Sequence, residues 1–168
     1  MSLFNLADLR RTLAPGQRLI GLDPGSRTIG VALSDVGLML ATPYGSLRRG
    51  KLAANAAEIL RLALKEGAGG LVVGLPLSLD GSLGPAAQAA RDWTHALTAA
   101  TGLPAAMWDE RLTSVAANRM LIGEADLSRK RRAAVVDQTA AAYMLQAALD
   151  ATRSDDGGKG QQGKRFFS

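Results

Sequence analysis

Residues 18–35 read R-L-I-G-L-D-P-G-S-R-T-I-G-V-A-L-S-D, and this stretch decides the fold. It begins as an apolar run that ends at Asp23, and Pro24-Gly25 then marks a tight turn. A second apolar run, which contains β-branched side chains, covers residues 28–34. Two strands joined by so short a connection pair antiparallel. The stretch therefore predicts a β-hairpin with a carboxylate at the end of its first strand.

The chain beyond this hairpin predicts alternating helices and strands. A third short strand is expected within residues 38–47. Helical periodicity predicts a helix over 51–66 that stops at Gly67. Further predicted elements are a buried parallel strand at 71–75, a helix from Pro85 to about 100, a strand at 105–109, a helix from Thr113 or Ser114 to about Ile122, and a last helix over about 133–151 whose apolar face includes Val136, Ala140, Tyr143, Met144 and Ala147.

This order of elements indicates an α/β fold with a mixed sheet of about five strands, flanked by helices. The first sixteen residues are expected to form a short amphipathic lead-in. Residues 1–152 are expected to form a single domain. Residues 153–168 are rich in Gly, Gln and Lys and show no periodicity, so we expect a disordered basic tail.

The composition excludes several classes of function. The chain has no cysteine and only one histidine. This composition excludes thiol chemistry and argues against histidine catalysis and zinc binding. No apolar run approaches the roughly 18 residues of a membrane-spanning helix, and we expect a soluble, cytoplasmic protein. A net charge of +5 and a pI near 10.1 favour a polyanionic partner such as nucleic acid.

Acidic residues occur at the ends of two predicted strands and near the start of the last helix. Asp23 closes the first strand, Asp109 and Glu110 close a later one, and Asp137 lies on the last helix. Ligands of open α/β sheets gather outside the carboxyl ends of the strands. Clustered carboxylates repel one another unless cations lie between them, and Mg²⁺ or Mn²⁺ suits such ligands. Each acid also has a structural alternative: a turn residue, an ion-pair partner of Arg111, or a helix N-terminal acid.

Four blocks of the sequence together carry a family resemblance. They are G-L-D-P-G-S-R-T-I-G-V-A-L-S-D at 21–35, V-V-G-L-P-L-S-L-D-G at 72–81, D-E-R-L-T-S at 109–114 and V-D-Q-T-A-A at 136–141. In this order and spacing they closely resemble the YqgF/RuvX family, over nearly all of residues 18–150. That family is ribonuclease H-like, and its members are described as Holliday junction resolvases and as the nuclease that trims precursor small-subunit ribosomal RNA.

The resemblance implies that Asp23, Glu110 and Asp137 are catalytic, metal-binding carboxylates. Asp109 has three possible roles: a ligand, a residue that supports the ligands from behind, or an orienting group for Arg111. Relative to the RuvC resolvases, the strand 71–75 offers no carboxylate, and Ala140 and Ala141 stand where a fourth acid would follow. The site therefore resembles a three-carboxylate one. This departure weakens the case for full junction resolution but not the case for hydrolysis.

The implied mechanism is hydrolysis of a phosphodiester by two Mg²⁺ or Mn²⁺ ions, with Asp23 as the bridging ligand. Arg27 or Arg111 would steady the phosphate. The run of Arg129, Lys130, Arg131 and Arg132 lies just before Asp137 and is expected to bind the nucleic acid backbone. A second basic group, Arg48, Arg49 and Lys51, is interpreted as solvated surface charge. Trp93 and Trp108 are interpreted as core residues.

The function that follows is a metal-dependent nuclease of RNA or branched DNA, working in processing of the pre-16S rRNA 5′ end, in resolution of Holliday junctions, or in both. It would act in the cytoplasm as a monomer or homodimer. One alternative is a phosphotransferase or ATPase of the actin-like superfamily, since D-P-G-S at 23–26 resembles a phosphate-gripping hairpin. Those proteins need two such domains, and this chain is too short for two. The other alternative is a non-catalytic RNA-binding module in which the acids are structural.

Overall fold

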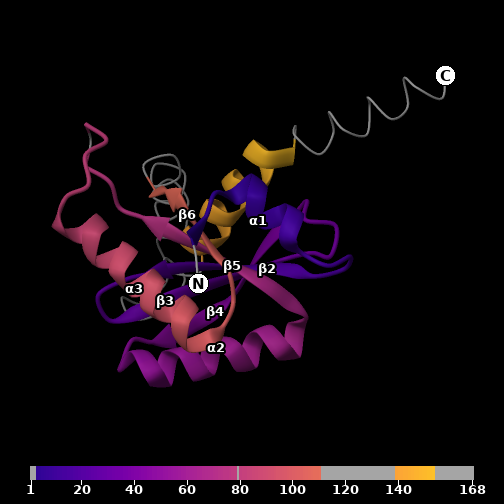
Figure 1. Cartoon of the computed structure of the whole chain (residues 1–168), viewed down its shortest axis with the longest axis horizontal. Coiled ribbons are helices and arrows are strands. Elements are labelled where there is room, and N and C mark those ends of the chain that lie inside the picture. Colours follow the sequence, from indigo (N-terminus) through magenta and orange to yellow (C-terminus); the bar gives the residue numbers. More distant parts are fainter. Residues whose placement is uncertain (1–2, 79, 111–138, 154–168) are drawn as a thin grey trace, which may run out of the picture.

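The computed structural model describes residues 3–78, 80–110 and 139–153 of the 168-residue chain. Its centre is a mixed sheet with the strand order β1-β6-β5-β2-β3-β4 (Figure 1). The strands are β1 (Leu3–Phe4), β2 (Arg18–Pro24), β3 (Thr28–Ser34), β4 (Ala41–Arg48), β5 (Ala68–Leu75) and β6 (Ala105–Asp109). The helices are α1 (Leu6–Thr12), α2 (Leu52–Glu66), α3 (Pro85–Thr101) and a further helix over residues 139–153. The expected α/β architecture is confirmed.

Strand directions bring several strand ends to one edge of the sheet. β2 and β3 pair antiparallel, as the opening stretch predicts, and β3 pairs antiparallel with β4. β2, β5 and β6 run parallel to one another. The last residues of β2, β4, β5 and β6 therefore lie at the same edge as the start of β3. We call this the carboxyl edge. Polar residues placed there from distant parts of the chain can meet.

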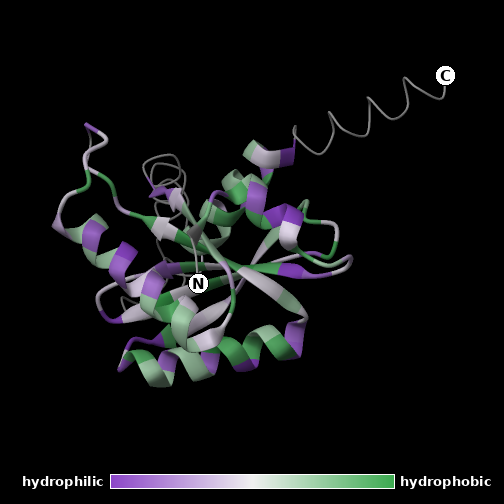
Figure 2. Ribbon diagram, viewed as in Figure 1, coloured by the Kyte–Doolittle hydropathy of each residue, from purple (hydrophilic) through white to green (hydrophobic). Residues whose placement is uncertain are grey.

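Helices cover both faces of the sheet. α2 and α3 lie on one face, and α1 and the helix 139–153 (yellow) lie on the other (Figure 1). In Figure 2 most hydrophilic residues lie on the helices and loops that surround the sheet. The α2 and α3 face buries Ile20, Leu22, Ile29, Ile59, Val73 and Leu97, and the opposite face buries Leu9, Leu19, Val72, Met144, Leu145 and Leu149. Trp93 and Trp108 are half-buried against these two clusters, which agrees with their expected core role.

The N-terminal lead-in is more structured than expected. β1 pairs parallel with β6, and it raises the number of strands from about five to six. α1 follows, with Asn5 accepting a hydrogen bond from the backbone N–H of Asp8 at its start. Leu6 and Leu9 are buried, so the amphipathic pattern reflects a short helix that packs on the sheet. The pattern was too short to predict the two-residue strand before it.

The buried face of the last helix differs from the predicted one. Ala140, Tyr143 and Ala147 are only half-buried. The reason lies in β2, where a Cβ on Gly21 would stand 2.9 Å from Leu145 Cβ and 3.3 Å from the carbonyl oxygen of Ala141. The missing side chain lets the helix approach the strand closely and so selects which face is buried. The residues on that face are Ala141, Ala142, Met144, Leu145, Ala148 and Leu149.

Several predicted segments lie outside the described residues. They are the helix from Thr113 or Ser114 to about Ile122, the first part of the last helix over 133–138 with Val136, and the basic tail after Arg153. The other predicted helices and strands are present. α2 ends at Gly67, whose φ of 69° is the left-handed conformation that favours glycine. Within the described part of the chain, no helix is long and apolar enough to cross a membrane.

Candidate active site at the carboxyl edge

Asp23 lies at the end of β2, on the carboxyl edge. It pairs in register with Gly30 of β3, and the turn that follows is closed by a hydrogen bond from Gly25 N–H to the carbonyl of Thr28, 2.8 Å long. Pro24 extends the strand by one residue before the turn. The side chain of Asp23 is half-buried. A rigid hairpin thus holds this carboxylate in place.

Glu110 reaches Asp23 from the other side of β5. It follows directly after β6, and β5 lies between β6 and β2. The carboxyl group of Glu110 is nevertheless hydrogen-bonded to that of Asp23. Burial, the hydrogen bond to Asp23 and the negative charges of Asp23 and Asp109 together raise the pKa of Glu110 from 4.5 to about 9, and burial contributes most. The raised pKa of Glu110 favours a proton held between the two carboxyl groups.

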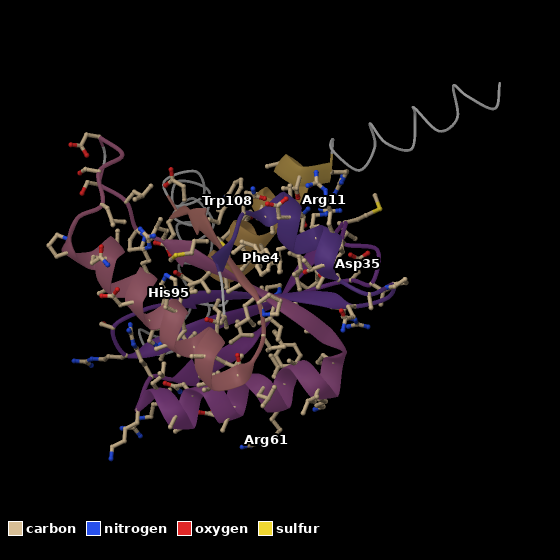
Figure 3. All side chains as sticks on the ribbon, viewed as in Figure 1. Phe4, Arg11, Asp35, Arg61, His95 and Trp108 are labelled. Carbon is tan, nitrogen blue, oxygen red and sulfur yellow. The ribbon has the colours of Figure 1, made fainter. Side chains whose placement is uncertain are left out.

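Gly74 in β5 makes the meeting of the two carboxyl groups possible. A Cβ built on Gly74 would overlap Oε1 of Glu110 and lie 2.9 Å from its Cγ. Gly74 pairs with Trp108 in β6, whose side chain lies on the same side of the sheet as α1 (Figure 3). Any larger residue in the middle strand would fill the space that Glu110 occupies. We call this space the Gly74 bay.

Sequence reasoning missed the role of Gly74. The sequence shows that the strand 71–75 offers no carboxylate, whereas the structure shows that its contribution is the absence of a side chain at Gly74. A signal was present, because an isolated glycine near the end of an apolar strand often marks a close approach by another group. That signal does not identify the group. Only the strand order shows that Glu110 is the residue that enters the bay.

The remaining predicted site residues divide into two groups. Arg27 is exposed in the β2–β3 turn on the carboxyl edge, and Asp109 is half-buried beside Glu110. The others lie outside the described residues, namely Asp137, Arg111, Arg129, Lys130, Arg131 and Arg132. Among residues 3–78, 80–110 and 139–153, no group of three or more His, Asp or Glu side chains could hold a metal ion. The described chain thus brings together two of the three predicted carboxylates.

The pair fits a hard divalent cation. All its donors are carboxylate oxygens, which Mg²⁺ and Mn²⁺ prefer. Two half-buried carboxyl groups in contact share a proton when no cation is present, and a cation can take the place of that proton. Gly74 keeps the space between the strands free of side-chain carbon. The residues present therefore suit such an ion.

Comparisons with known proteins identify the family of this chain. The RuvX family, described as "Holliday junction resolvase", matches residues 17–151. A protein of Gluconacetobacter diazotrophicus named "Putative pre-16S rRNA nuclease" is 68% identical over 152 residues, which are 90% of this chain and 99% of the relative. A protein of Acidiphilium cryptum with the same name is 67% identical over 150 residues, 89% of this chain and 94% of the relative.

A solved structure shares the fold. It is the RuvC of T. thermophilus in complex with a Holliday junction substrate, which matches with a TM-score of 0.52 and 16% identity. The match covers 82% of this chain and 96% of that chain. At this identity the likeness establishes the ribonuclease H-like fold that the sequence predicts, and nothing about substrate.

Proposed function

Since the chain belongs to the RuvX family, we propose that it is a divalent-metal-dependent nuclease whose substrate is the precursor of 16S ribosomal RNA. The two relatives that cover almost its whole length carry the name of such a nuclease. The family description adds Holliday junction DNA as a second candidate substrate. The reaction class is the same for both, namely hydrolysis of a phosphodiester bond.

The observation that carries this proposal is the contact between Asp23 and Glu110. Two carboxyl groups from strands that are not neighbours meet over the Gly74 bay. Burying them together is costly, and the raised pKa of Glu110 records that cost. Perturbed carboxyl pairs of this kind cluster at functional sites. A purely structural role would be met more cheaply by apolar side chains.

We assign the metal ligands to Asp23, Glu110 and Asp137, and the metal to Mg²⁺ or Mn²⁺. The described part of the last helix begins at residue 139, and its residue Ala141 lies against Gly21, two residues before Asp23. This contact supports Asp137 as the third ligand. Ala141 is fully buried against β2, so that position has no room for a fourth carboxylate. A three-carboxylate site follows.

The residues of the site divide the work. Asp23 is fixed by its hairpin and supplies a charged oxygen at a set position. Glu110 is buried and must lose its proton before it can serve as a ligand. A divalent cation held there would supply Lewis-acid chemistry, activating water and stabilising charge on the leaving oxygen. Arg27, exposed on the same edge, is placed to bind a phosphate oxygen.

The wider assignments follow from the same proposal. Residues 1–152 form one catalytic domain, and Arg111 and the run Arg129, Lys130, Arg131 and Arg132 contact the nucleic acid backbone. A processing role on ribosomal RNA places the protein in the cytoplasm. One copy of the chain supplies all three carboxylates, so cleavage of a single strand requires no partner subunit. Symmetric junction cleavage would require a homodimer.

The experiment is a cleavage assay with and without Mn²⁺. Its substrates are labelled precursor 16S rRNA, four-way junction DNA and single-stranded RNA. Wild type should cut the precursor only with Mn²⁺, and Asp23→Asn should lose more than the roughly 10–100-fold that losing an outer-shell partner costs. Asp8→Asn is the control, because Asp8 is an exposed acid on α1 in an ion pair with Arg11. Undiminished cutting by Asp23→Asn, or metal-independent cutting, would overturn the proposal. Binding without any cleavage would favour the RNA-binding module.

A further inference from the structure

Four cations lie at the carboxyl edge, next to the turn that follows Asp23. They are Arg27, Arg48, Arg49 and Lys51, and we call them the basic ledge. We propose that the basic ledge binds the phosphate backbone of the RNA strand beside the cleavage site, with Arg49 as the positioning residue that joins it to the Asp23 turn. This inference rests on the proposed nuclease function and adds a path for the strand.

Backbone pairing places the ledge residues side by side. The N–H of Arg49 donates to the carbonyl of Arg27, 2.9 Å away, and Arg48 pairs in register with Thr28. Lys51 precedes the first residue of α2 as its N-cap. The β2–β3 turn, the end of β4 and the start of α2 thus form one corner of the molecule. Asp23 lies four residues before Arg27, at the same corner.

Arg49 differs from its three neighbours because its guanidinium is engaged within the protein. Its Nη1 donates to the carbonyl of Gly25, 2.7 Å away, and its charged carbon lies 5.6 Å from the ring centroid of Trp93 on α3. The side chain is half-buried, so the interpretation as solvated charge is wrong for this residue. Arg49 ties the segment 48–51 to the turn that begins directly after Asp23.

A buried asparagine on α2 holds the segment 48–51 through hydrogen bonds to its backbone. Asn55 of α2 is only 1% exposed. Its side-chain amide donates to the carbonyl of Arg48, 3.0 Å away, and its oxygen accepts from the N–H of Gly50, 2.9 Å away. Both backbone groups are therefore fixed. The backbone that carries Arg48 and Lys51 is thus held in place before a strand binds, which lowers the entropy lost on binding.

The other three cations are available for a ligand. Arg27, Arg48 and Lys51 are exposed, and no ion pair joins them to a carboxylate among the described residues. The first turn of α2 carries no acidic residue. An exposed group of positive charges beside a hydrolytic centre complements a chain of phosphates. A strand whose scissile phosphate lies at Asp23 would continue over residues 25–28 and then 48–51.

The test measures RNA binding in the Asp23→Asn background, so that no substrate is cut. Arg48→Gln with Lys51→Gln is compared with Arg61→Gln with Lys65→Gln, two exposed cations of the same types further along α2 (Figure 3 shows Arg61). The probe is a labelled single-stranded RNA from the 16S precursor, titrated by fluorescence anisotropy at several salt concentrations. The double variant Arg48→Gln with Lys51→Gln should make the negative slope of log K against log salt shallower by about 1.4. Each lost phosphate contact accounts for about 0.7 of this change.

The control pair should leave that slope unchanged. Equal losses in both pairs would mean diffuse attraction and would overturn the ledge. Tighter binding of single-stranded DNA of the same sequence would overturn the assignment to RNA. Because binding is measured without cleavage, the ledge can fail while the nuclease stands. The expected change of slope in the ledge variant, together with an absence of cleavage by the wild-type protein, would refute the nuclease. The ledge would then remain as a binding surface.

Arg49 has a separate test in the wild-type background. Arg49→Lys keeps the charge but cannot both bond Gly25 and stack on Trp93 in the same way. A positioning role predicts that kcat falls about tenfold while KM and the salt dependence of binding stay near wild type. The fall is expected because the turn after Asp23 loses its hydrogen bond from Arg49. KM should hold because the ledge keeps its charge. A rise in KM with unchanged kcat would make Arg49 a simple phosphate contact and would refute the positioning role.

Discussion

At the scale of single residues, one proton on the carboxyl pair of Asp23 and Glu110 decides whether the pair can bind a metal ion. Glu110 is buried, hydrogen-bonded to Asp23 and close to the charge of Asp109. In the metal-free protein these surroundings favour the neutral acid, whereas metal binding requires the charged form. Glu110 is therefore favoured as a neutral acid without metal and as a charged carboxylate with metal bound. A divalent cation and a proton compete for the same pair of carboxyl groups.

This competition predicts how stability depends on pH in the absence of metal. The pKa of Glu110 is about 9 in the folded protein against an ordinary value of 4.5. The folded state thus holds a proton that the unfolded chain releases, and this contribution is full at low pH and is lost as pH rises towards about 9. Glu110→Gln, which imitates the protonated acid, should gain stability over wild type between about pH 5 and pH 9.

Urea unfolding in EDTA measures the difference directly. Asp8→Asn is the control and should show no such trend, because Asp8 is exposed. A constant gap between wild type and Glu110→Gln across this range would contradict the raised pKa. With saturating Mn²⁺ the wild type should be more stable than Glu110→Gln, since the charged carboxylate of Glu110 then binds the ion.

At the scale of helices and strands, two absent side chains set the geometry. Gly21 lets the last helix lie close on β2, and Gly74 lets Glu110 cross β5. Both glycines lie in interior strands, where they cost strand stability, so packing must compensate. The two close approaches bring the helix that follows Asp137 and the strand that precedes Glu110 towards Asp23.

Gly74→Ala should damage activity without unfolding the protein. The added methyl group would displace the Glu110 carboxyl group from Asp23, because their positions overlap. We expect a loss of about 10–100-fold in kcat/KM, comparable to that of an outer-shell partner. Gly45→Ala on β4 is the matched control, since a Cβ there would meet nothing within 4 Å. Equal activity in the two variants would show that the bay is not needed.

Gly21→Ala should act on stability. Its Cβ would lie 2.9 Å from Leu145 Cβ, so the helix must move outward, at a cost of about 1–3 kcal/mol. Urea unfolding measures this cost. Adding Leu145→Gly, which removes the Leu145 Cβ that the new methyl group meets, should make the double variant less destabilised than the sum of the two single variants. Simple additivity would argue against the close contact of helix and strand.

Much of this element order can be predicted from the sequence. The hairpin around Asp23, the helix ending at Gly67 and the strand ending at Asp109 follow from apolar runs and turn residues, which are local signals. The strand β1 could not be predicted, because two residues carry no periodicity and their pairing with β6 is a long-range contact. The encounter of Glu110 with Gly74 also depends on strand order, which no single segment encodes.

At the scale of the whole molecule, opposite charges share one edge. The parallel strands deliver the carboxylates Asp23 and Glu110, and the antiparallel strands with α2 deliver the cations Arg27, Arg48 and Lys51. A metal ion bound by the first group and phosphates bound by the second would each offset charge on this edge. The net charge of +5 adds long-range attraction for a polyanion. Association with RNA should therefore weaken as salt rises.

Isothermal titration with Mn²⁺ tests the central claim most directly. In the proposed site, Asp23, Glu110 and Asp137 bind the same ion. Asp23→Asn, Glu110→Gln and Asp137→Asn should each weaken Mn²⁺ binding by at least about tenfold, while Asp8→Asn binds as wild type does. Unchanged Mn²⁺ affinity in Asp137→Asn, or an absence of binding in wild type, would contradict the account.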